Sequence, residues 1–327
     1  MKLTLGDIQK ITVGALSVTE QEDGFHFIRC TEKQTAAWYK RSDFLGNGST
    51  CSTGIRLDFH TTSKTVEFSA SKGRKFDLYI DDLFRSRYTM NDYRDKGERA
   101  VIYLTDCLGN EKKEGDETRV TLYLPSHEAG IIDYIAIDDG ATLNPHKFDM
   151  KMLFIGDSIT QGWNSRYDSL AYAQKVAKFF NAESINQGIG GSFFNEDAFE
   201  HIDFDPDVTV VAYGTNDWGY RNTLDELRSH AAAHLKLIKD AFGTSGKKIF
   251  VISPIWRETG NQRKMGSFEE CRAVVAECAD SLGLIHIDGL SLVPPNPEFF
   301  ADQTLHPNDL GFSLYAENLI KQMLKYL

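Results

Sequence analysis

The sequence of 327 residues contains no long apolar stretch. A helix that crosses a membrane needs roughly 18 to 20 consecutive apolar residues, and no run of that length occurs. The first eleven residues interrupt their apolar positions with Lys2, Asp7 and Lys10, which is unlike a secretory signal peptide. We therefore expect no signal peptide, no membrane insertion and no membrane partner.

Positive charge is also scarce. The chain has 36 Lys and Arg residues against 47 Asp and Glu residues, so its formal net charge is −11. Nonspecific binding to nucleic acids needs a net basic surface, so this balance argues against a nucleic-acid partner. Apolar residues make up 41% of the chain, which is too many for a disordered protein. The length fits one large domain or two ordinary ones.

Cysteine is rare, and its pattern does not indicate a disulfide framework. The five cysteines are odd in number and none occurs in a Cys-x-x-Cys pair. Cys271 and Cys278 lie seven residues apart in a helix-like segment, which separates them by about 10 Å along a helix axis. They cannot pair with each other, and we expect reduced cysteines in a cytoplasmic protein.

Metal-binding motifs are missing as well. His230 and His234 stand four residues apart, but the motif His-Glu-x-x-His is absent and no third ligand is evident. The pairs Asp81-Asp82 and Asp138-Asp139 are acidic turns without the Asp-x-Asp-x-Asp-Gly pattern of a calcium loop. We expect neither a metal nor a cofactor, and we interpret the two histidines as part of a solvated helix face.

The first 145 residues show the two-residue period of half-buried strands. Apolar and polar residues alternate from Phe25 to about Ile137, and no convincing long helix interrupts them. Glycine-containing turns separate the runs, which is typical of an antiparallel sandwich. We therefore predict an all-β sandwich over residues 1–145. The clearest strands are 55–59, 76–80 and 120–124, and the turns include 46–48, 72–73, 109–110 and 115–116.

The rhythm changes after Asn144-Pro145, where we place the domain boundary. Residues 146–327 alternate short apolar runs with helical patterns, which predicts a doubly wound parallel sheet of about five strands. Thr223 is placed to cap the longest helix and Gly243 to end it, and Ser267 begins a capping box. The expected strands are 151–155, 183–186, 208–212, 248–252 and 284–287, and the expected helices are 169–180, 223–242, 268–282 and 311–324.

Four polar segments follow strands or precede the last helix of this second half. Ser158 comes directly after the first parallel strand, at the end where open α/β sheets place their active sites. A serine hydroxyl needs a nearby base and donors for the oxyanion that its attack creates. Gly188-Ile189-Gly190-Gly191 after the second strand, Asn216 after the third, and His306 before the last helix lie where such groups belong.

In this order, the four segments resemble the SGNH (GDSL) hydrolase family over about residues 150–327. The segments are Gly156-Asp157-Ser158, Asn186-x-Gly188-x-x-Gly191, Gly214-Thr215-Asn216-Asp217, and Asp302 to His306. The resemblance implies a flavodoxin-like three-layer α/β fold and an acyl-transferring serine enzyme.

The resemblance also implies roles for individual residues. Ser158 is the nucleophile, His306 its base, and Asp302 the residue that orients His306. The oxyanion hole consists of the Ser158 N–H, the Gly191 N–H and the Asn216 side-chain amide, with Gly190 as an alternative to Gly191. Asp302 lies four residues before His306 where the family usually has three, so a backbone carbonyl is an alternative partner for the imidazole.

The first half bears a short resemblance of its own. Residues 75–79, Lys-Phe-Asp-Leu-Tyr, are similar to the Gly-x-Asp-Leu-Tyr signature of sandwich domains that precede some SGNH esterases, with Lys75 in place of the glycine. Two-domain relatives of this type, with a jelly-roll-like sandwich, include esterases that deacetylate carbohydrates.

Aromatic residues gather just after the predicted strands. Trp163, Phe193, Trp218 and Trp256 are candidate substrate-binding residues, since rings at this edge can stack on a sugar or enclose an acyl chain. Phe194 shares the location. The alternative for each ring is ordinary packing beneath the loops.

The hypothesis that joins these observations is a metal-independent serine esterase. It would hydrolyse short acyl esters, acetyl esters above all, on a small molecule or an oligosaccharide. Two alternatives stay open. The same acyl-enzyme would make an acyltransferase if an alcohol replaced water, and a degenerate hydrolase domain would make a non-catalytic carbohydrate-binding protein. The oligomeric state does not follow from the sequence.

Overall fold

The computed structural model describes residues 1–110, 113, 115–259 and 263–327. The chain forms two compact units, and the second is discontinuous in sequence. Unit 1 comprises Met1–Arg29 and Thr50–Phe148, and unit 2 comprises Cys30–Ser49 and Asp149–Leu327. No helix in the described ranges combines the length and apolar character needed to cross a membrane.

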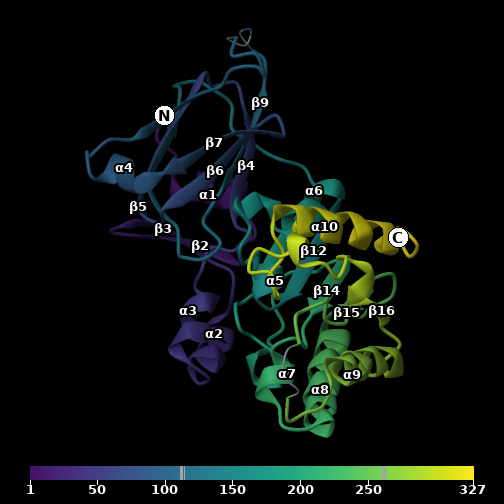
Figure 1. The fold of residues 1–327 in the computed structure, drawn as a ribbon. Helices are drawn as coiled ribbons and strands as arrows, with labels where there is room; N and C mark the ends of the chain where they lie inside the picture. Colours follow the sequence, from purple (N-terminus) through teal and green to yellow (C-terminus); the bar gives the residue numbers. More distant parts are fainter. Residues whose placement is uncertain (111–112, 114, 260–262) are drawn as a thin grey trace. The chain divides into compact units, whose positions relative to one another are not determined.

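Unit 1 consists of two antiparallel sheets (Figure 1). The first has the order β1-β4-β9-β6-β7, with β11 also paired to β4, and the second has the order β2-β3-β10-β5-β8. The strands are β1 (Thr12–Val13), β2 (Ser17–Gln21), β3 (Gly24–Ile28), β4 (Arg56–Thr61), β5 (Thr65–Lys72), β6 (Lys75–Ile80), β7 (Leu83–Thr89), β8 (Ala100–Tyr103), β9 (Thr118–Tyr123), β10 (Ile131–Ile137) and β11 (Asn144–Pro145), and two short helices are α1 (Leu5–Ile11) and α4 (Met90–Arg94).

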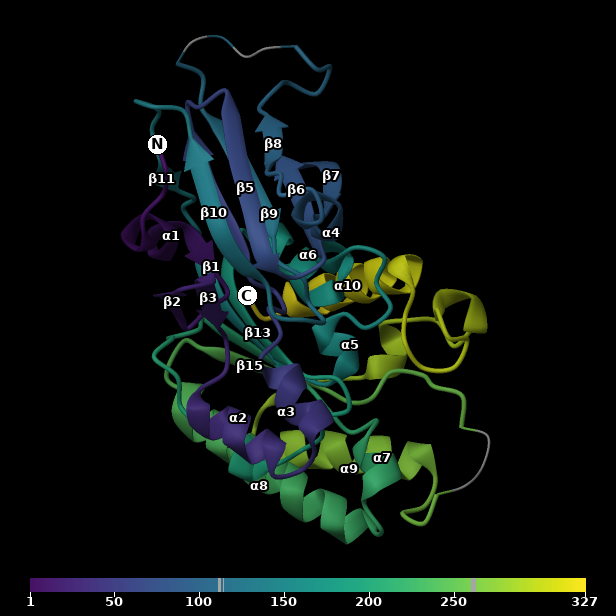
Figure 2. The same ribbon diagram turned by 90° about the vertical axis from the view of Figure 1, so that its left-hand side faces the viewer.

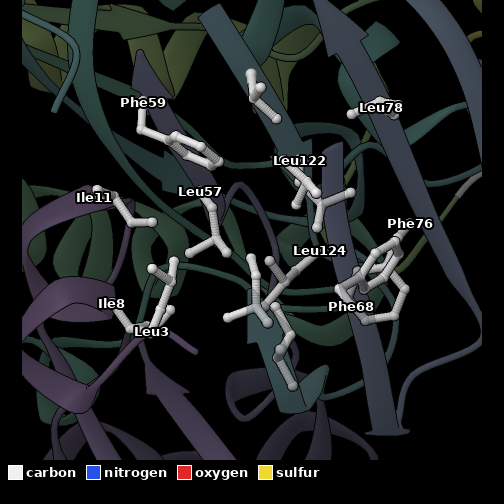
Figure 3. Close-up of a cluster of buried hydrophobic side chains, with 14 of the residues drawn as sticks. Leu3, Ile8, Ile11, Leu57, Phe59, Phe68, Phe76, Leu78, Leu122 and Leu124 are labelled. Atoms are coloured by element: carbon white, nitrogen blue, oxygen red, sulfur yellow. The ribbon is translucent and has the colours of Figure 1, made fainter. Parts of the chain in front are cut away.

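One hydrophobic cluster joins the two sheets, as the predicted sandwich requires. Leu57 and Leu122 from the first sheet share it with Phe68 from the second (Figure 3). The rings of Phe68 on β5 and Phe76 on β6 lie 5.7 Å apart across this core. Alternate residues of each strand supply the core because successive side chains point to opposite faces of a sheet.

The Lys-Phe-Asp-Leu-Tyr segment forms strand β6, and its acidic residue has a structural partner. The Asp77 carboxylate is fully buried and accepts hydrogen bonds from Arg87 Nε at 2.6 Å and Nη2 at 2.8 Å on the neighbouring strand β7. A buried carboxylate is tolerated when a guanidinium pairs with it in this two-pronged way. The segment therefore stabilises the sandwich.

Unit 2 contains a parallel sheet in the order β13-β12-β14-β15-β16. Numbered along this unit, the order is 2-1-3-4-5, which is the flavodoxin-like arrangement. Helix α6 packs against α10 on one face of the sheet, and α8 packs against α9 on the other (Figure 1). The elements are β12 (Met150–Gly156), β13 (Ala182–Gly188), β14 (Val208–Ala212), β15 (Lys248–Ile252), β16 (Ile285–Ile287), α5 (Ser158–Gln161), α6 (Tyr172–Phe179), α7 (Asp217–Tyr220), α8 (Leu224–Phe242), α9 (Phe268–Ser281) and α10 (Asp309–Met323), with the 3-10 turns η1 (Asp168–Leu170), η2 (Glu196–Ala198), η3 (Gly289–Ser291) and η4 (Pro297–Phe299).

The predicted helix ends agree well with this half of the structure. The Thr223 hydroxyl accepts the Glu226 N–H at the start of α8, Gly243 ends the helix, and Ser267 forms a capping box with Glu270 in α9. The helix expected from residue 169 begins instead with the turn η1 and becomes α-helical at Tyr172.

The segment Cys30–Ser49 departs from the sequence prediction. We expected it within the sandwich, but it forms helices α2 (Glu32–Tyr39) and α3 (Asp43–Ser49) and belongs to unit 2. The turn expected at residues 46–48 lies inside α3. Gly46 has a packing role there, because a Cβ at this position would lie 2.2 Å from the Tyr39 ring of α2.

Helices α2 and α3 cover a part of unit 2 that lacks a helix of its own. The connection from β13 to β14 contains only the short turn η2, where a doubly wound fold normally has a helix. Trp38 and Leu45 are buried in one cluster with Ile189 and Phe193 of this connection. Figure 2 shows the ribbon of α2 and α3, which belong to unit 2. The inserted segment therefore supplies apolar cover that the β13–β14 crossover does not provide.

Candidate active site

Ser158 lies at the carboxyl end of β12, as predicted. Strand β12 ends at Gly156, and Asp157 caps the one-turn helix α5 by accepting the Ile159 N–H at 2.9 Å. This turn presents the Ser158 Oγ to the Nε2 of His306, which lies 2.9 Å away. Gly156 permits the close approach of β14, because a Cβ there would lie 2.8 Å from the Ala212 carbonyl oxygen.

The structure also brings Asp302 to His306. The Asp302 Oδ2 lies 2.7 Å from His306 Nδ1, so Nδ1–H donates to the carboxylate and Nε2 accepts from the Ser158 hydroxyl. The four-residue spacing is accommodated by a turn in which Gln303 has φ of 60°. The extra residue therefore changes the backbone of the loop without separating the two side chains.

The other carboxylate oxygen of Asp302 organises this loop. Its Oδ1 accepts the backbone N–H groups of Thr304, Leu305 and His306 at 3.0, 2.8 and 3.1 Å. Partial burial acts to raise the pKa of Asp302, but these N–H donors and the His306 ring outweigh it and hold the pKa well below its usual range. Asp302 is consequently ionised at neutral pH, as an orienting carboxylate must be.

The candidate oxyanion donors differ in the hydrogen bonds that they already make. The Gly190 N–H donates to Gln161 Oε1 at 2.6 Å, so it is already committed. Within the described residues, no hydrogen bond involves the N–H of Ser158 or of Gly191, whose φ is 77°. This favours Gly191 over Gly190. The Asn216 amide is oriented by donating through Nδ2 to the Ser192 carbonyl oxygen at 2.8 Å.

Asp157 and Asp217 are buried carboxylates, and the sequence did not indicate that either has an unusual pKa. Burial raises the pKa of Asp157 to about 7; the Ile159 N–H opposes the shift, whereas the charge of Asp217 adds to it. Burial likewise raises the pKa of Asp217 to about 6, against the attraction of Arg221. The two acids lie 60 positions apart in the sequence, and only the fold shows that both are buried, which is the cause of their raised pKa values.

The predicted aromatic residues divide into two groups. Trp163 is half-buried, and its ring lies 6.3 Å from the His306 ring. Phe193 and Trp218 are only 8% and 2% exposed, so they have little surface to offer a substrate. Phe193 packs on Trp38, and Trp218 packs on a phenylalanine of α9 and donates its indole N–H to the backbone. Both rings therefore have packing roles in the structure, and their contact with a substrate stays a prediction.

Trp256 and Phe194 also have packing partners. Trp256 lies 4.8 Å, ring to ring, from Phe300 at the margin of the core, and Phe194 is fully buried beside Tyr213. A further ring beside Trp163 was missed. Phe44 of α3 lies 6.4 Å from Trp163, and no local signal in the sequence places residue 44 in this unit.

His230 and His234 do not share a solvated face. His230 Nδ1 lies 2.8 Å from Glu196, whereas His234 is buried and accepts the Asn195 N–H at 3.1 Å. Burial lowers the pKa of His234 to about 4, so this ring is neutral. Among the residues that the structure describes, no group of three or more His, Cys, Asp or Glu side chains is arranged to hold a metal ion.

Comparison with known proteins finds a family match within the second half of the chain. Residues 154–314 match the model of the GDSL-like lipase/acylhydrolase family, and this range contains Ser158, Asn216 and His306. The chain carries a GDSL-like acylhydrolase domain. The chain is 27% identical over 205 residues to an acetylxylan esterase of Xylanibacter ruminicola, an alignment that covers 53% of this chain and 43% of that esterase. The chain thus matches less than half the length of this curated relative.

Solved structures share the two-part fold of this chain. The salicylyl-acyltransferase SsfX3 of a tetracycline biosynthetic pathway has a TM-score of 0.80 and 15% identity, covering 97% of this chain and 95% of that one. The acetyl xylan esterase Est2A of Butyrivibrio proteoclasticus has a TM-score of 0.64 and 15% identity, covering 99% and 98%. At this level of identity the similarity establishes the fold.

Proposed function

We propose that this protein is a serine esterase that removes short acyl groups, in particular acetyl groups, from carbohydrates. The observation that carries the proposal is the hydrogen-bonded series from Ser158 Oγ through both ring nitrogens of His306 to the ionised Asp302. This arrangement activates a serine by giving its proton an acceptor of fixed tautomer. The acetylxylan esterase relative supports the choice of substrate class.

The reaction proceeds in two halves. Ser158 Oγ attacks the ester carbonyl while His306 Nε2 takes its proton, and the oxyanion is bound by the Ser158 N–H, the Gly191 N–H and the Asn216 amide. The tetrahedral intermediate then collapses, the C–O bond to the alcohol breaks, and His306 returns the proton to the departing alkoxide.

Water completes the cycle at the acyl-enzyme. His306 now removes a proton from water as it attacks the acyl carbon, and the bond to Ser158 breaks with protonation of the serine oxygen. The products are a carboxylic acid and the free enzyme. Asp302 stays ionised throughout and stabilises the imidazolium that forms in each half.

Fluorophosphonate labelling together with ester hydrolysis tests the proposal. The parent protein should be labelled at Ser158 and should hydrolyse acetyl esters, and Ser158→Ala should lose both properties while remaining folded by circular dichroism. Ser63→Ala is a matched control, since Ser63 is a buried serine of unit 1 whose hydroxyl donates to the Thr65 carbonyl oxygen. A parent protein that is neither labelled nor active would overturn the esterase and support a carbohydrate-binding role.

An acyltransferase is the second candidate, because the fold neighbour with a TM-score of 0.80 is an acyltransferase. Acyl transfer to an alcohol needs the same Ser158 acyl-enzyme. Adding acceptor sugars to a burst assay distinguishes the two reactions. A hydrolase releases free acid at a rate that acceptors do not change, whereas a transferase forms a new ester and releases less acid.

A further inference from the structure

Phe44 is an exposed aromatic residue beside the acyl-transfer site. The side chain is 59% exposed although it belongs to the short helix α3. Its ring lies 6.4 Å from the Trp163 ring at 67°, and the Trp163 ring lies 6.3 Å from the His306 ring. A Cβ at Gly191 would lie 3.3 Å from Phe44 Cε1. The rings of His306, Trp163 and Phe44 therefore form a row from the proposed general base to the protein surface, and Phe44 lies next to Gly191.

Packing alone does not account for the position of Phe44. The neighbouring Leu45 is 5% exposed, and with Trp38 it buries the apolar side of this segment. Phe44 takes no part in that cluster and leaves most of its ring in water, where it forgoes the favourable burial that a large apolar side chain provides. A single exposed apolar side chain is common on protein surfaces, so the exposure of Phe44 gains meaning from the position of its ring beside Trp163 and Gly191.

The backbone around Phe44 is held in place by short contacts. The Leu45 N–H donates to Ser42 Oγ at 3.2 Å, and the Tyr39 hydroxyl donates to Asn47 Oδ1 at 2.8 Å. Gly46 allows the Tyr39 ring to lie directly against α3. The ring of Phe44 is thus held on an ordered backbone, so less conformational entropy is lost when a substrate binds to it.

We propose that Phe44 and Trp163 form a stacking platform for the sugar that leaves when Ser158 is acylated, and that Phe44 is a specificity residue for carbohydrate esters. This inference rests on the proposed esterase function. His306 protonates the leaving oxygen, so a ring in contact with His306 borders the alcohol part of the ester. The C–H faces of a pyranose pack against aromatic rings, whereas an acetyl group needs no exposed platform.

Kinetics on two acetyl esters that differ only in their alcohol test the platform. The substrates are a partially acetylated xylo-oligosaccharide and ethyl acetate. Phe44→Ala should raise KM for the oligosaccharide roughly three- to tenfold, the range of a single aromatic contact, with kcat within about twofold. The kcat/KM for ethyl acetate should not change, and Phe44→Tyr should retain the parent KM for the oligosaccharide.

Phe179→Ala is the matched control, because Phe179 is a similarly exposed phenylalanine of the same unit (57%) on α6. It should leave both substrates unaffected. Equal effects of Phe44→Ala on both esters, or no effect on either, would overturn the platform. A change in preference between acetyl and butyryl groups on one sugar would also overturn it, because Phe44 would then contact the acyl chain.

A binding measurement separates failure of the platform from failure of the esterase. Calorimetric titration of the Ser158→Ala protein with xylohexaose should show affinity that the additional change Phe44→Ala lowers roughly three- to tenfold. If the parent proves inactive on every ester but this difference appears, the platform stands and the proposed reaction falls. If Phe44→Ala leaves the affinity unchanged or no binding is detected, the platform falls.

Discussion

The role of Asp302 stayed open in the sequence, because it lies four residues before His306 where the family usually has three. The structure places its carboxylate 2.7 Å from His306 Nδ1 despite the four-residue spacing. Replacing it by asparagine removes the charge that stabilises the imidazolium and allows the wrong tautomer. In the serine protease that serves as the reference case for such triads, the corresponding change costs about 10⁴ in kcat. We expect Asp302→Asn to lower kcat at least ~10²-fold in steady-state ester hydrolysis.

The control for this variant is Asp309→Asn, since Asp309 lies near the same loop but accepts a hydrogen bond from the Arg166 N–H instead. It should keep near-parent kcat. A kcat for Asp302→Asn within about threefold of the parent would mean that Asp302 only shapes the loop through its Oδ1 contacts.

Asn216 is expected to act on the transition state rather than on the bound substrate. Its amide is oriented by the Ser192 carbonyl, which leaves the second amide hydrogen for the oxyanion. Asn216→Ala should therefore lower kcat about 10²- to 10³-fold with a small change in KM. Asn318→Ala, which removes a similar amide donated to the Leu292 carbonyl, should leave both constants unchanged. An effect on KM alone would assign Asn216 to ground-state binding.

The buried carboxylate of Asp157 makes a prediction for stability against pH. Its folded pKa of about 7 lies above the ordinary aspartate value, so between about pH 4 and pH 7 the folded state holds a proton that the unfolded state has released. Asp157 therefore lowers the free energy of unfolding as pH rises through this window. Asn at this position still caps α5 but does not titrate. The free energy of unfolding of Asp157→Asn, relative to that of the parent, should therefore rise by more than about 1 kcal/mol between pH 4 and pH 8.

Urea unfolding at several pH values measures this gain. Asp138→Asn is a control of opposite sign. Burial acts to raise the pKa of Asp138, but hydrogen bonds from Thr65 and the Lys64 N–H outweigh burial and lower it. The stability from that group is present above its unfolded pKa and is lost as pH falls through the folded value. If the difference in free energy of unfolding between the parent and Asp157→Asn did not change with pH, the raised pKa of Asp157 would be contradicted.

At the scale of elements, the strongly periodic segments could be predicted and the inserted helices could not. Strand β14 has the predicted bounds, and α8 begins after the predicted cap Thr223, because long amphipathic patterns and caps are local signals. Helices α2 and α3 are short, and their stability comes from contacts with residues about 150 positions later. Such contacts leave no local pattern, and Phe44 was missed for this reason. The burial of His234 escaped prediction for a similar reason, since it depends on the crossover packed over α8.

Trp38 tests the role of the inserted helices. It is 3% exposed in the cluster with Ile189 and Phe193, so Trp38→Ala should lower the free energy of unfolding of unit 2 by about 3–5 kcal/mol. The unfolding transition that coincides with loss of Ser158 labelling reports on this unit. Phe44→Ala, in the same segment but exposed, should cost under about 1 kcal/mol. Equal stability losses in the two variants would contradict the packing described for α2.

For the whole molecule, the discontinuous second unit predicts which fragments fold. A fragment of residues 149–327 lacks α2 and α3, so the apolar residues of the β13–β14 connection lose their cover. We expect this fragment to be less stable in urea and more prone to aggregate than a chain in which residues 30–49 are joined to it by a flexible linker. Equal midpoints for the two fragments would show that the inserted helices are dispensable for folding.

The discontinuity also bears on the order in which the protein is made. Residues 30–49 leave the ribosome before Ile189 and Phe193, against which Trp38 and Leu45 pack. At about 5–20 residues per second, the intervening stretch of roughly 150 residues takes on the order of 10–30 s to synthesise. During this interval the apolar side of α2 and α3 has no native partner. We therefore expect the nascent chain to expose this apolar side early and to complete the folding of unit 2 only after most of that unit has been translated.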